Sequence, residues 1–228
     1  TLTFYAAPMV HWPEVMVSYD DVDKVLFSAD GFGKFGALSA DEDWACEARR
    51  YYFNLCGKYG MQVTRLLEKA SKLDIQTICP LHGPILKEDL GYYIGLYKTW
   101  AAYVVETEGV LVAYASIHGG TKAAAELMAE ILKEKGAGKV AITDLSRDDQ
   151  AEAVEDAFRM GRLVVAAASY DSSVFPPMYD FLHHLQLKGY QNRRVAIIEN
   201  GSWAPTAGKV MRKMLEEMKG ITIVEPVV

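Results

Sequence analysis

Short apolar runs alternate with amphipathic stretches along the second half of the chain. The apolar runs cover residues 110–116, 140–146, 163–169, 194–199 and 221–228. The amphipathic stretches cover residues 120–135, 150–160, 176–187 and 205–219. This alternation is typical of buried parallel strands joined by crossover helices. It predicts an α/β domain over residues 110–228, with a doubly wound parallel five-stranded sheet that lacks its last helix.

The first 109 residues lack this regular alternation and are expected to form a different domain. Their pattern predicts strands over 22–28 and 75–79 and helices over 43–56, 61–73 and 87–105. Glu106-Thr107-Glu108-Gly109 is a short polar joint, so we expect the boundary between residues 109 and 110.

Both ends of the chain run directly into apolar stretches, residues 2–10 at the start and 221–228 at the end. No polar lead-in precedes the first stretch, and nothing follows the second to cover its sheet. We therefore expect a piece of a longer protein. The alternative is a mature chain that has lost its Met.

Composition narrows the class of protein. Half of the 228 residues are apolar and a quarter are charged, as in ordinary globular chains. No apolar run of about 18 residues and no secretory signal occurs, which predicts a cytoplasmic protein that does not enter a membrane. The net charge is −6 without a basic cluster, so nucleic acid is not an expected partner. The three cysteines form no C-x-x-C pair, which argues against a disulfide framework or a thiolate zinc site.

A candidate phosphate-binding loop follows the first apolar run of the second half. It consists of Ser116, Ile117, His118, Gly119, Gly120 and Thr121. Two hydroxyls, free backbone N–H groups and a helix N-terminus can hold a phosphate monoester without a lysine. A glycine pair after a strand is by itself a weak signal, because turns also need glycine.

Two further loops are expected at the same edge of the sheet, where such folds bind ligands. They contain Ser169, Tyr170, Asp171, Ser172 and Ser173, and Asn200, Gly201, Ser202 and Trp203. Together with the S-x-x-G-x-T loop they resemble the flavodoxin family, whose ligand is flavin mononucleotide (FMN). The resemblance implies that residues 116 and 118–121 hold the flavin phosphate. It also implies that the other two loops flank the ring, with Tyr170 and Trp203 as stacking candidates. The second loop lacks the Pro-Thr expected after Ser169.

The first half offers candidate metal ligands in short turns. His11 lies in His-Trp-Pro, Asp30 follows a predicted strand, and His82 lies in Pro-Leu-His-Gly-Pro. Imidazole and carboxylate suit iron, manganese or zinc, and one carboxylate can bridge two ions. A lone His-Gly-Pro is more often only a turn.

These motifs, followed by a flavodoxin-like domain, resemble the flavodiiron proteins, in which a metallo-β-lactamase-like αββα domain precedes the flavodoxin-like one. The resemblance implies that His11 and His82 each bind one iron of a non-haem di-iron pair and that Asp30 bridges the pair. The family's other ligands form an H-x-E-x-D cluster, which is absent from these 228 residues. The ligand set is therefore incomplete, and we expect the chain as given to bind iron weakly or not at all.

The same resemblance implies an oxidoreductase that reduces dioxygen to water or nitric oxide to nitrous oxide. Electrons would pass from a small redox carrier such as rubredoxin through FMN to the irons, in a head-to-tail homodimer. An alternative is a flavodoxin-like electron-transfer module without a working metal site. A zinc hydrolase is disfavoured, because it would not need a flavin domain.

Overall fold

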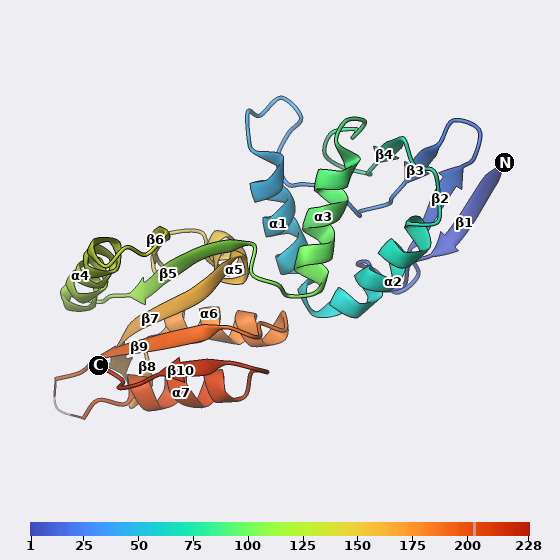
Figure 1. Ribbon diagram of the computed structural model, residues 1–228. Coiled ribbons are helices and arrows are strands. Elements are labelled where there is room, and N and C mark those ends of the chain that lie inside the picture. The colour runs from blue at the N-terminus through green and yellow to red at the C-terminus, as the bar shows by residue number, and fades with distance from the viewer. Residues whose placement is uncertain (203) are drawn as a thin grey trace. The chain divides into compact units, whose positions relative to one another are not determined.

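The computed structural model describes residues 1–202 and 204–228, which form two compact units, Thr1–Val104 and Val105–Val228 (Figure 1). The division lies before the expected polar joint. Thr107 and Gly109 already belong to the first strand of the second unit, where they pair with Met160 and Lys139. Only the first two residues of this strand reach solvent: Thr107 is half-buried and Glu108 is exposed, whereas every residue from Gly109 on is buried.

The second unit contains the predicted five-stranded parallel sheet. Its strands are β5 (Thr107–Ala115), β6 (Lys139–Asp144), β7 (Met160–Tyr170), β9 (Arg194–Asn200) and β10 (Thr222–Val224). They lie in the order β10-β9-β7-β5-β6, and every neighbouring pair is parallel. The short strand β8 (Ser173–Val174), which the sequence did not predict, pairs antiparallel with the end of β7.

Four helices cover this sheet, close to the predicted bounds. They are α4 (Gly120–Glu134), α5 (Gln150–Arg159), α6 (Pro176–Leu187) and α7 (Ala207–Glu216). Helix α4 packs on one face through Ala125 and Ala129, against Val112 and Val164 of the central strands. Helices α5, α6 and α7 pack side by side and against the same strands. Small residues on α4 let it approach the sheet closely, and the central strands are buried on both faces, as parallel sheets require.

The first unit has a four-stranded sheet and three α-helices. Strands β1 (Leu2–Ala6), β2 (Met16–Asp20) and β3 (Val25–Phe27) are antiparallel, and β4 (Thr77–Cys79) is parallel to β3. The helices are α1 (Trp44–Leu55), α2 (Gly60–Ala70) and α3 (Leu90–Ala101), with a 3₁₀ turn η1 (Gly57–Tyr59). The sequence did not predict β1 and β2. Strand β1 is almost entirely exposed, so it lacks the alternation of buried and exposed positions that marks a strand.

An aromatic core joins the helices of the first unit. Tyr52, Tyr97 and Trp100 are buried together, with ring centroids 5.1–5.4 Å apart. One face of the sheet is also buried, through residues such as Val17 and Leu26. The opposite face is apolar but exposed: Phe4, Met16 and Phe27 have exposed fractions of 62%, 60% and 48%.

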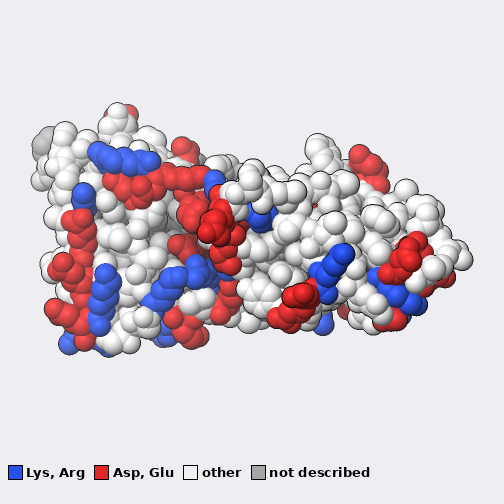
Figure 2. Space-filling view, turned by 90° about the horizontal axis from the view of Figure 1, so that it is seen from above, with Lys and Arg blue, Asp and Glu red and all other residues white. Residues whose placement is uncertain are grey.

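Acidic and basic side chains are mixed over the face of the molecule that Figure 2 shows, without a broad basic area. Among the described residues, no helix is both long enough and apolar enough to cross a membrane.

Candidate functional sites

A pocket of about 720 Å³ lies in the second unit, where β5, β7 and β9 end. The three predicted loops line it. The lining residues are Ser116, Ile117, His118, Gly120, Thr121, Ala168, Ser169, Tyr170, Asp171, Ser172, Asn200, Gly201, Ser202, Ala204 and Thr206. A volume of this size is within the range of small-molecule pockets, about 300–1,000 Å³.

The first loop holds its hydroxyls in buried positions. Ser116 and Thr121 are almost fully buried, and Ser116 Oγ accepts a hydrogen bond from Gly119 N at 3.0 Å. Gly119 has a φ of +94° and is the N-cap residue of α4, which has no side-chain cap. The first N–H groups of α4 are therefore available to an anion, and the helix dipole favours negative charge there. Gly119 itself does not line the pocket.

The second loop is a tight β-hairpin between β7 and β8. Ser169 pairs with Val174 and Tyr170 with Ser173, and the two turn residues, Asp171 and Ser172, have φ angles of +47° and +57°. Two consecutive positive φ angles are the mark of a type I′ turn. Ser173 is engaged in this pairing and does not line the pocket, whereas the Tyr170 side chain lines it and is 44% exposed.

The third loop is fastened to the other two. Ser169 Oγ accepts hydrogen bonds from Thr206 N at 2.8 Å and Ala207 N at 3.1 Å, so it caps α7. Thr206 Oγ1 donates to Ser173 O at 2.8 Å, and Asn200 Nδ2 donates to Thr121 Oγ1 at 3.3 Å. The pocket is therefore held in shape before any ligand enters.

Some site residues differ from the expectation. Trp203 lies outside the described residues. Ala168, Ala204 and Thr206 line the pocket but were not among the predicted residues. Thr206 had a sequence signal, because it lies at the beginning of the amphipathic stretch 205–219, where a helix cap is expected. The alanines had none, since an alanine carries no chemistry that a motif could register.

The first unit brings the three predicted metal ligands together. His11 Nε2 lies 3.3 Å from Asp30 Oδ2, and His82 Nε2 lies 3.6 Å from Asp30 Oδ1. All three side chains are between 18% and 35% exposed. Each imidazole therefore faces a different oxygen of one carboxylate, which is the donor arrangement that a carboxylate bridging two cations needs.

The loop after β3 orients His82. Its Nδ1 lies 3.0 Å from the carbonyl oxygen of Lys34, and because a carbonyl only accepts, Nδ1 is the protonated nitrogen and Nε2 keeps its lone pair. The imidazole also packs directly on Gly33, where a Cβ would lie 2.3 Å from its Cε1. Glycine is therefore required at position 33 to leave room for the ring.

Tyr51 of α1 forms an aromatic wall beside the same cluster. Its ring centroid is 4.5 Å from that of His82 and 6.0 Å from that of His11, both edge-on. Burial raises the pKa of Tyr51, and the nearby Asp30 carboxylate adds to the rise. The tyrosine is therefore a neutral phenol at this site.

Two imidazoles and one carboxylate suit iron, manganese or zinc. The residues present therefore fit part of a di-metal site, with three of the ligands that two ions need.

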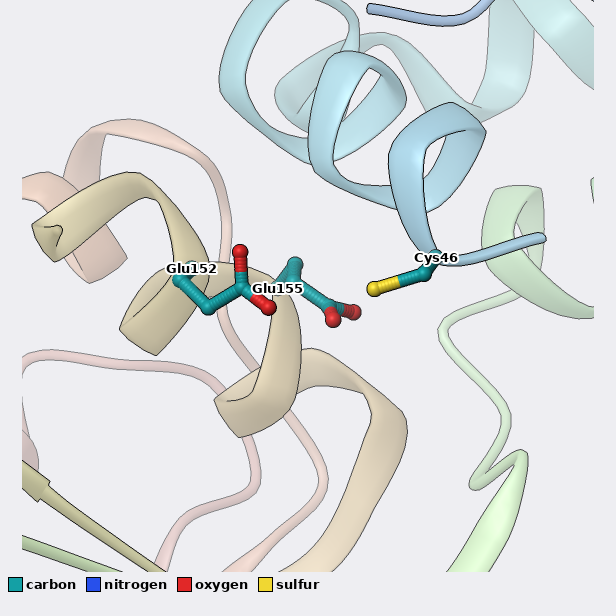
Figure 3. A group of neighbouring side chains, drawn as sticks. All are labelled: Cys46, Glu152 and Glu155. Carbon is teal, nitrogen blue, oxygen red and sulfur yellow. The ribbon is translucent and has the colours of Figure 1, made fainter. Parts of the chain in front are cut away.

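Another group of possible ligands consists of Cys46, Glu152 and Glu155. Figure 3 shows Glu152 and Glu155 on α5 and Cys46 at the beginning of α1. The cysteine belongs to the first unit and the glutamates to the second. Neither unit by itself offers three ligands of this group, so we infer no metal site from it.

Comparison with known proteins gives a consistent set of relatives, although no family model matches the chain. The coenzyme F420H2 oxidase of Methanothermobacter marburgensis is 31% identical over 197 residues, which are 82% of this chain and 48% of that protein. The nitric oxide reductase of Moorella thermoacetica is 27% identical over 235 residues, which are 99% of this chain and 58% of that protein. The chain spans about half the length of the curated relatives it matches.

The structural likeness covers both units. A flavo di-iron protein variant from Thermotoga maritima has a TM-score of 0.86 and 25% identity over 98% of this chain and 58% of its own. The prediction of a flavodoxin-like unit preceded by part of a metallo-β-lactamase-like unit is thereby confirmed.

Proposed function

Because this chain belongs to the flavodiiron family, we propose that it supplies the FMN site and part of the di-iron site of an oxidoreductase. The substrate is dioxygen, nitric oxide or both, and the electrons come from a small redox carrier. When bound, FMN exchanges electrons singly or in pairs, and a carboxylate-bridged iron pair binds a diatomic oxidant.

The observation that supports the flavin site most directly is the pocket formed by the three loops. Its buried Ser116 and Thr121 hydroxyls and the uncapped N-terminus of α4 form one polar end, where a phosphate fits. Tyr170 and the residues around Asn200 form the other walls, where a flat ring has room. In this proposal the first loop anchors the phosphate and the hairpin at 169–174 positions the ring.

Three residues carry the metal part of the proposal. His11 and His82 would hold iron through Nε2, and the Asp30 carboxylate, which lies beside both imidazoles, would be shared between the ions. The Lys34 carbonyl holds His82 in the tautomer that leaves Nε2 free, and Tyr51 covers both imidazoles. This proposal also includes a head-to-tail homodimer, a cytoplasmic location and a small redox carrier such as rubredoxin as the electron donor.

A second candidate function is an electron-transfer module without a working metal site. The observation that favours it is the donor count, because His11, Asp30 and His82 lie together at this site and the sequence holds no H-x-E-x-D cluster. The two functions are separated by the longer protein: an upstream H-x-E-x-D cluster in it would support the oxidoreductase, and its absence would support the electron-transfer module.

The first experiment measures FMN and iron per chain. We expect one FMN per chain with little iron, because the pocket is complete and the ligand set is not. No FMN uptake would overturn the proposed function. A redox carrier that reduces FMN in the longer protein, when that protein reduces neither oxygen nor nitric oxide, would support the second candidate.

The phosphate loop is tested by combining Ser116→Ala with Thr121→Ala. Loss of two buried hydroxyl contacts is expected to weaken FMN binding by about tenfold or more, since each hydrogen bond to a charged group contributes about 1.5–3 kcal/mol. Ser146→Ala with Thr222→Ala is the matched control, because both side chains are exposed and outside the pocket. Unchanged FMN affinity in the first pair would remove the phosphate-loop assignment.

A further inference from the structure

Two apolar cavities adjoin each other inside the first unit. The outer cavity has a volume of about 130 Å³ and is lined by residues of α2, α3, β3 and β4, among them Ile78. The inner cavity has a volume of about 20 Å³ and lies between the sheet and α2. Leu26, Phe32, Leu67 and Ala70 line both cavities, which therefore meet at these four residues. The proposed contacts to FMN and iron give neither cavity a role.

The outer cavity reaches the surface between α2 and α3. Ser71 and Lys98 line it, and both residues are exposed. The same two residues, together with Leu67, also line a surface groove of about 280 Å³. A small molecule in solution therefore meets the outer cavity through this groove.

The inner cavity ends beside the candidate metal ligands. Val10 and Gly31 line it, and they are the chain neighbours of His11 and Asp30. Ser28 Oγ donates a hydrogen bond to Gly31 O at 2.6 Å, which closes the turn that carries Asp30. This turn is therefore one wall of the inner cavity.

The lining of the inner cavity favours an apolar occupant over water. Among the described residues that line it, only Ser28 and Tyr97 carry polar side-chain atoms. Ser28 Oγ is bonded to Gly31 O, and Tyr97 OH accepts a hydrogen bond from Phe32 N at 2.7 Å. Apolar cavities of about 150 Å³ stay dry and take up xenon, and one small molecule needs about 10–15 Å³ by the same measure as a water. Both cavities therefore have room for a small apolar guest.

We propose that these two cavities bind the apolar diatomic gas of the proposed function and conduct it from the α2–α3 surface to the cluster of His11, Asp30 and His82. The destination of the gas rests on the proposed function. An uncharged diatomic gas moves favourably from water into apolar surroundings, so the cavities raise its concentration beside the ligands. Voids larger than a water molecule are few in a domain. Two that adjoin, one reaching the surface and the other the ligand turn, form a path.

The test uses this chain as it is, without FMN or iron. Dissolved dioxygen is the probe, because its unpaired electrons speed the NMR relaxation of nearby methyl groups. With rising oxygen pressure we expect stronger enhancement at Leu67 and Ile78 of the outer cavity, and at Val10 and Val17 of the inner one, than at Leu86. Leu86 is equally buried but lines neither cavity. No excess over Leu86 would overturn the proposal.

Ala70→Leu fills the place where the cavities meet. Leucine is a good helix former, so α2 should be retained. The enhancement at Val10 and Val17 should fall by about twofold or more, since a filled space in a close-packed interior excludes a guest. If this variant does not fold, Ala70→Val is a smaller filling for the same measurement. Full enhancement in a folded variant would show that the inner cavity is not reached through the outer one and would overturn the conducting role.

Arg65→Leu is the matched control. It introduces the same residue on α2, at an exposed position that lines neither these cavities nor the surface groove. The enhancement at Val10 and Val17 should therefore stay the same. An equal loss in Arg65→Leu would show a general change of the first unit and would overturn the proposal.

The remaining outcomes separate this path from the proposed function. If the chain takes up no FMN, the proposed function has failed, whereas the relaxation measurement still decides whether gas enters the first unit. In the longer protein, Ala70→Leu should raise the KM for dioxygen and leave kcat unchanged. An unchanged KM would mean that gas reaches the cluster directly from solvent, and the conducting role would be wrong.

Discussion

The two units build their sites in different ways. In the second unit the pocket lies at the end of one parallel sheet. Hydrogen bonds of Ser169, Thr206 and Asn200 connect its three loops. In the first unit two candidate ligands, His11 and His82, lie beside a third, Asp30. The candidate flavin pocket thus lies within one unit, whereas the candidate metal cluster has only part of the ligands that two ions need.

The two sheets also differ in how many of their faces are buried. The central strands of the second unit are buried on both faces. The sheet of the first unit buries Val17 and Leu26 on one face and exposes Phe4 and Met16 on the other. Burial of apolar area is the dominant favourable term in folding, so the comparison indicates that the second unit is the more stable of the two.

The largest effect is expected from a substitution that removes the central residue of the metal cluster and leaves the FMN pocket unchanged. Asp30→Ala removes the carboxylate between the two imidazoles, and we expect saturable Co²⁺ binding, weak in the unchanged chain, to be abolished. Changes to residues that merely support a metal ligand cost about 10–100-fold in affinity, and a bridging ligand should cost more. Cobalt absorption measures the effect, and FMN affinity should stay the same. Equal Co²⁺ binding by both proteins would show that Asp30 is not a ligand.

The next effect concerns the support of His82. Gly33→Ala places a methyl group 2.3 Å from the His82 ring, and we expect a loss of about 1–3 kcal/mol in the stability of the first unit, typical of overpacking. The ¹⁵N shifts of His82 should also change as its bond to the Lys34 carbonyl is lost. Gly95→Ala is the control, because nothing lies within 4 Å of its added Cβ and the site is inside α3. An unchanged His82 tautomer in Gly33→Ala would contradict the positioning role.

A smaller effect is expected where the loops of the second unit are fastened. Ser169→Ala removes the acceptor for Thr206 N and Ala207 N, and loss of such a cap costs about 1 kcal/mol. Chemical denaturation, monitored by a spectroscopic signal that reports on the second unit, measures this loss of stability. FMN should bind more weakly, because the hairpin and the third loop separate more easily. If Ser169→Ala has the stability and the FMN affinity of the unchanged protein, the hydrogen bonds to Ser169 Oγ do not shape the pocket.

The smallest expected effect is a difference in hydrogen exchange, which tests which of the two units is more stable. Hydrogen exchange should be faster for amides of β2 and β3 than for those of β5 and β7, since local stability follows the burial of apolar contacts. Mass spectrometry of peptides from each unit gives the result. Slower exchange in the first unit would reverse the inferred order.

Much of the second unit was predictable from its pattern. The central strands are continuous apolar runs between helical periodicities, so even α6 was placed at its observed bounds, residues 176–187. The first unit was less predictable, because β1 is exposed along nearly its whole length and β3 and β4 have three residues each. Such strands acquire their conformation from their partners and carry little periodicity of their own.

The site followed the same division. The sequence alone predicted which side chains could carry chemistry, namely the hydroxyls and glycines of residues 116–121 and the candidate ligands His11, Asp30 and His82. Only the tertiary structure decided that Ser173 pairs with Tyr170 away from the pocket, that Ser169 caps α7, and that Gly33 and Lys34 fix the orientation of His82. The physical reason is that a motif records which atoms can donate, accept or bind. Which of those atoms meet depends on hydrogen bonds and close contacts between segments far apart in the chain.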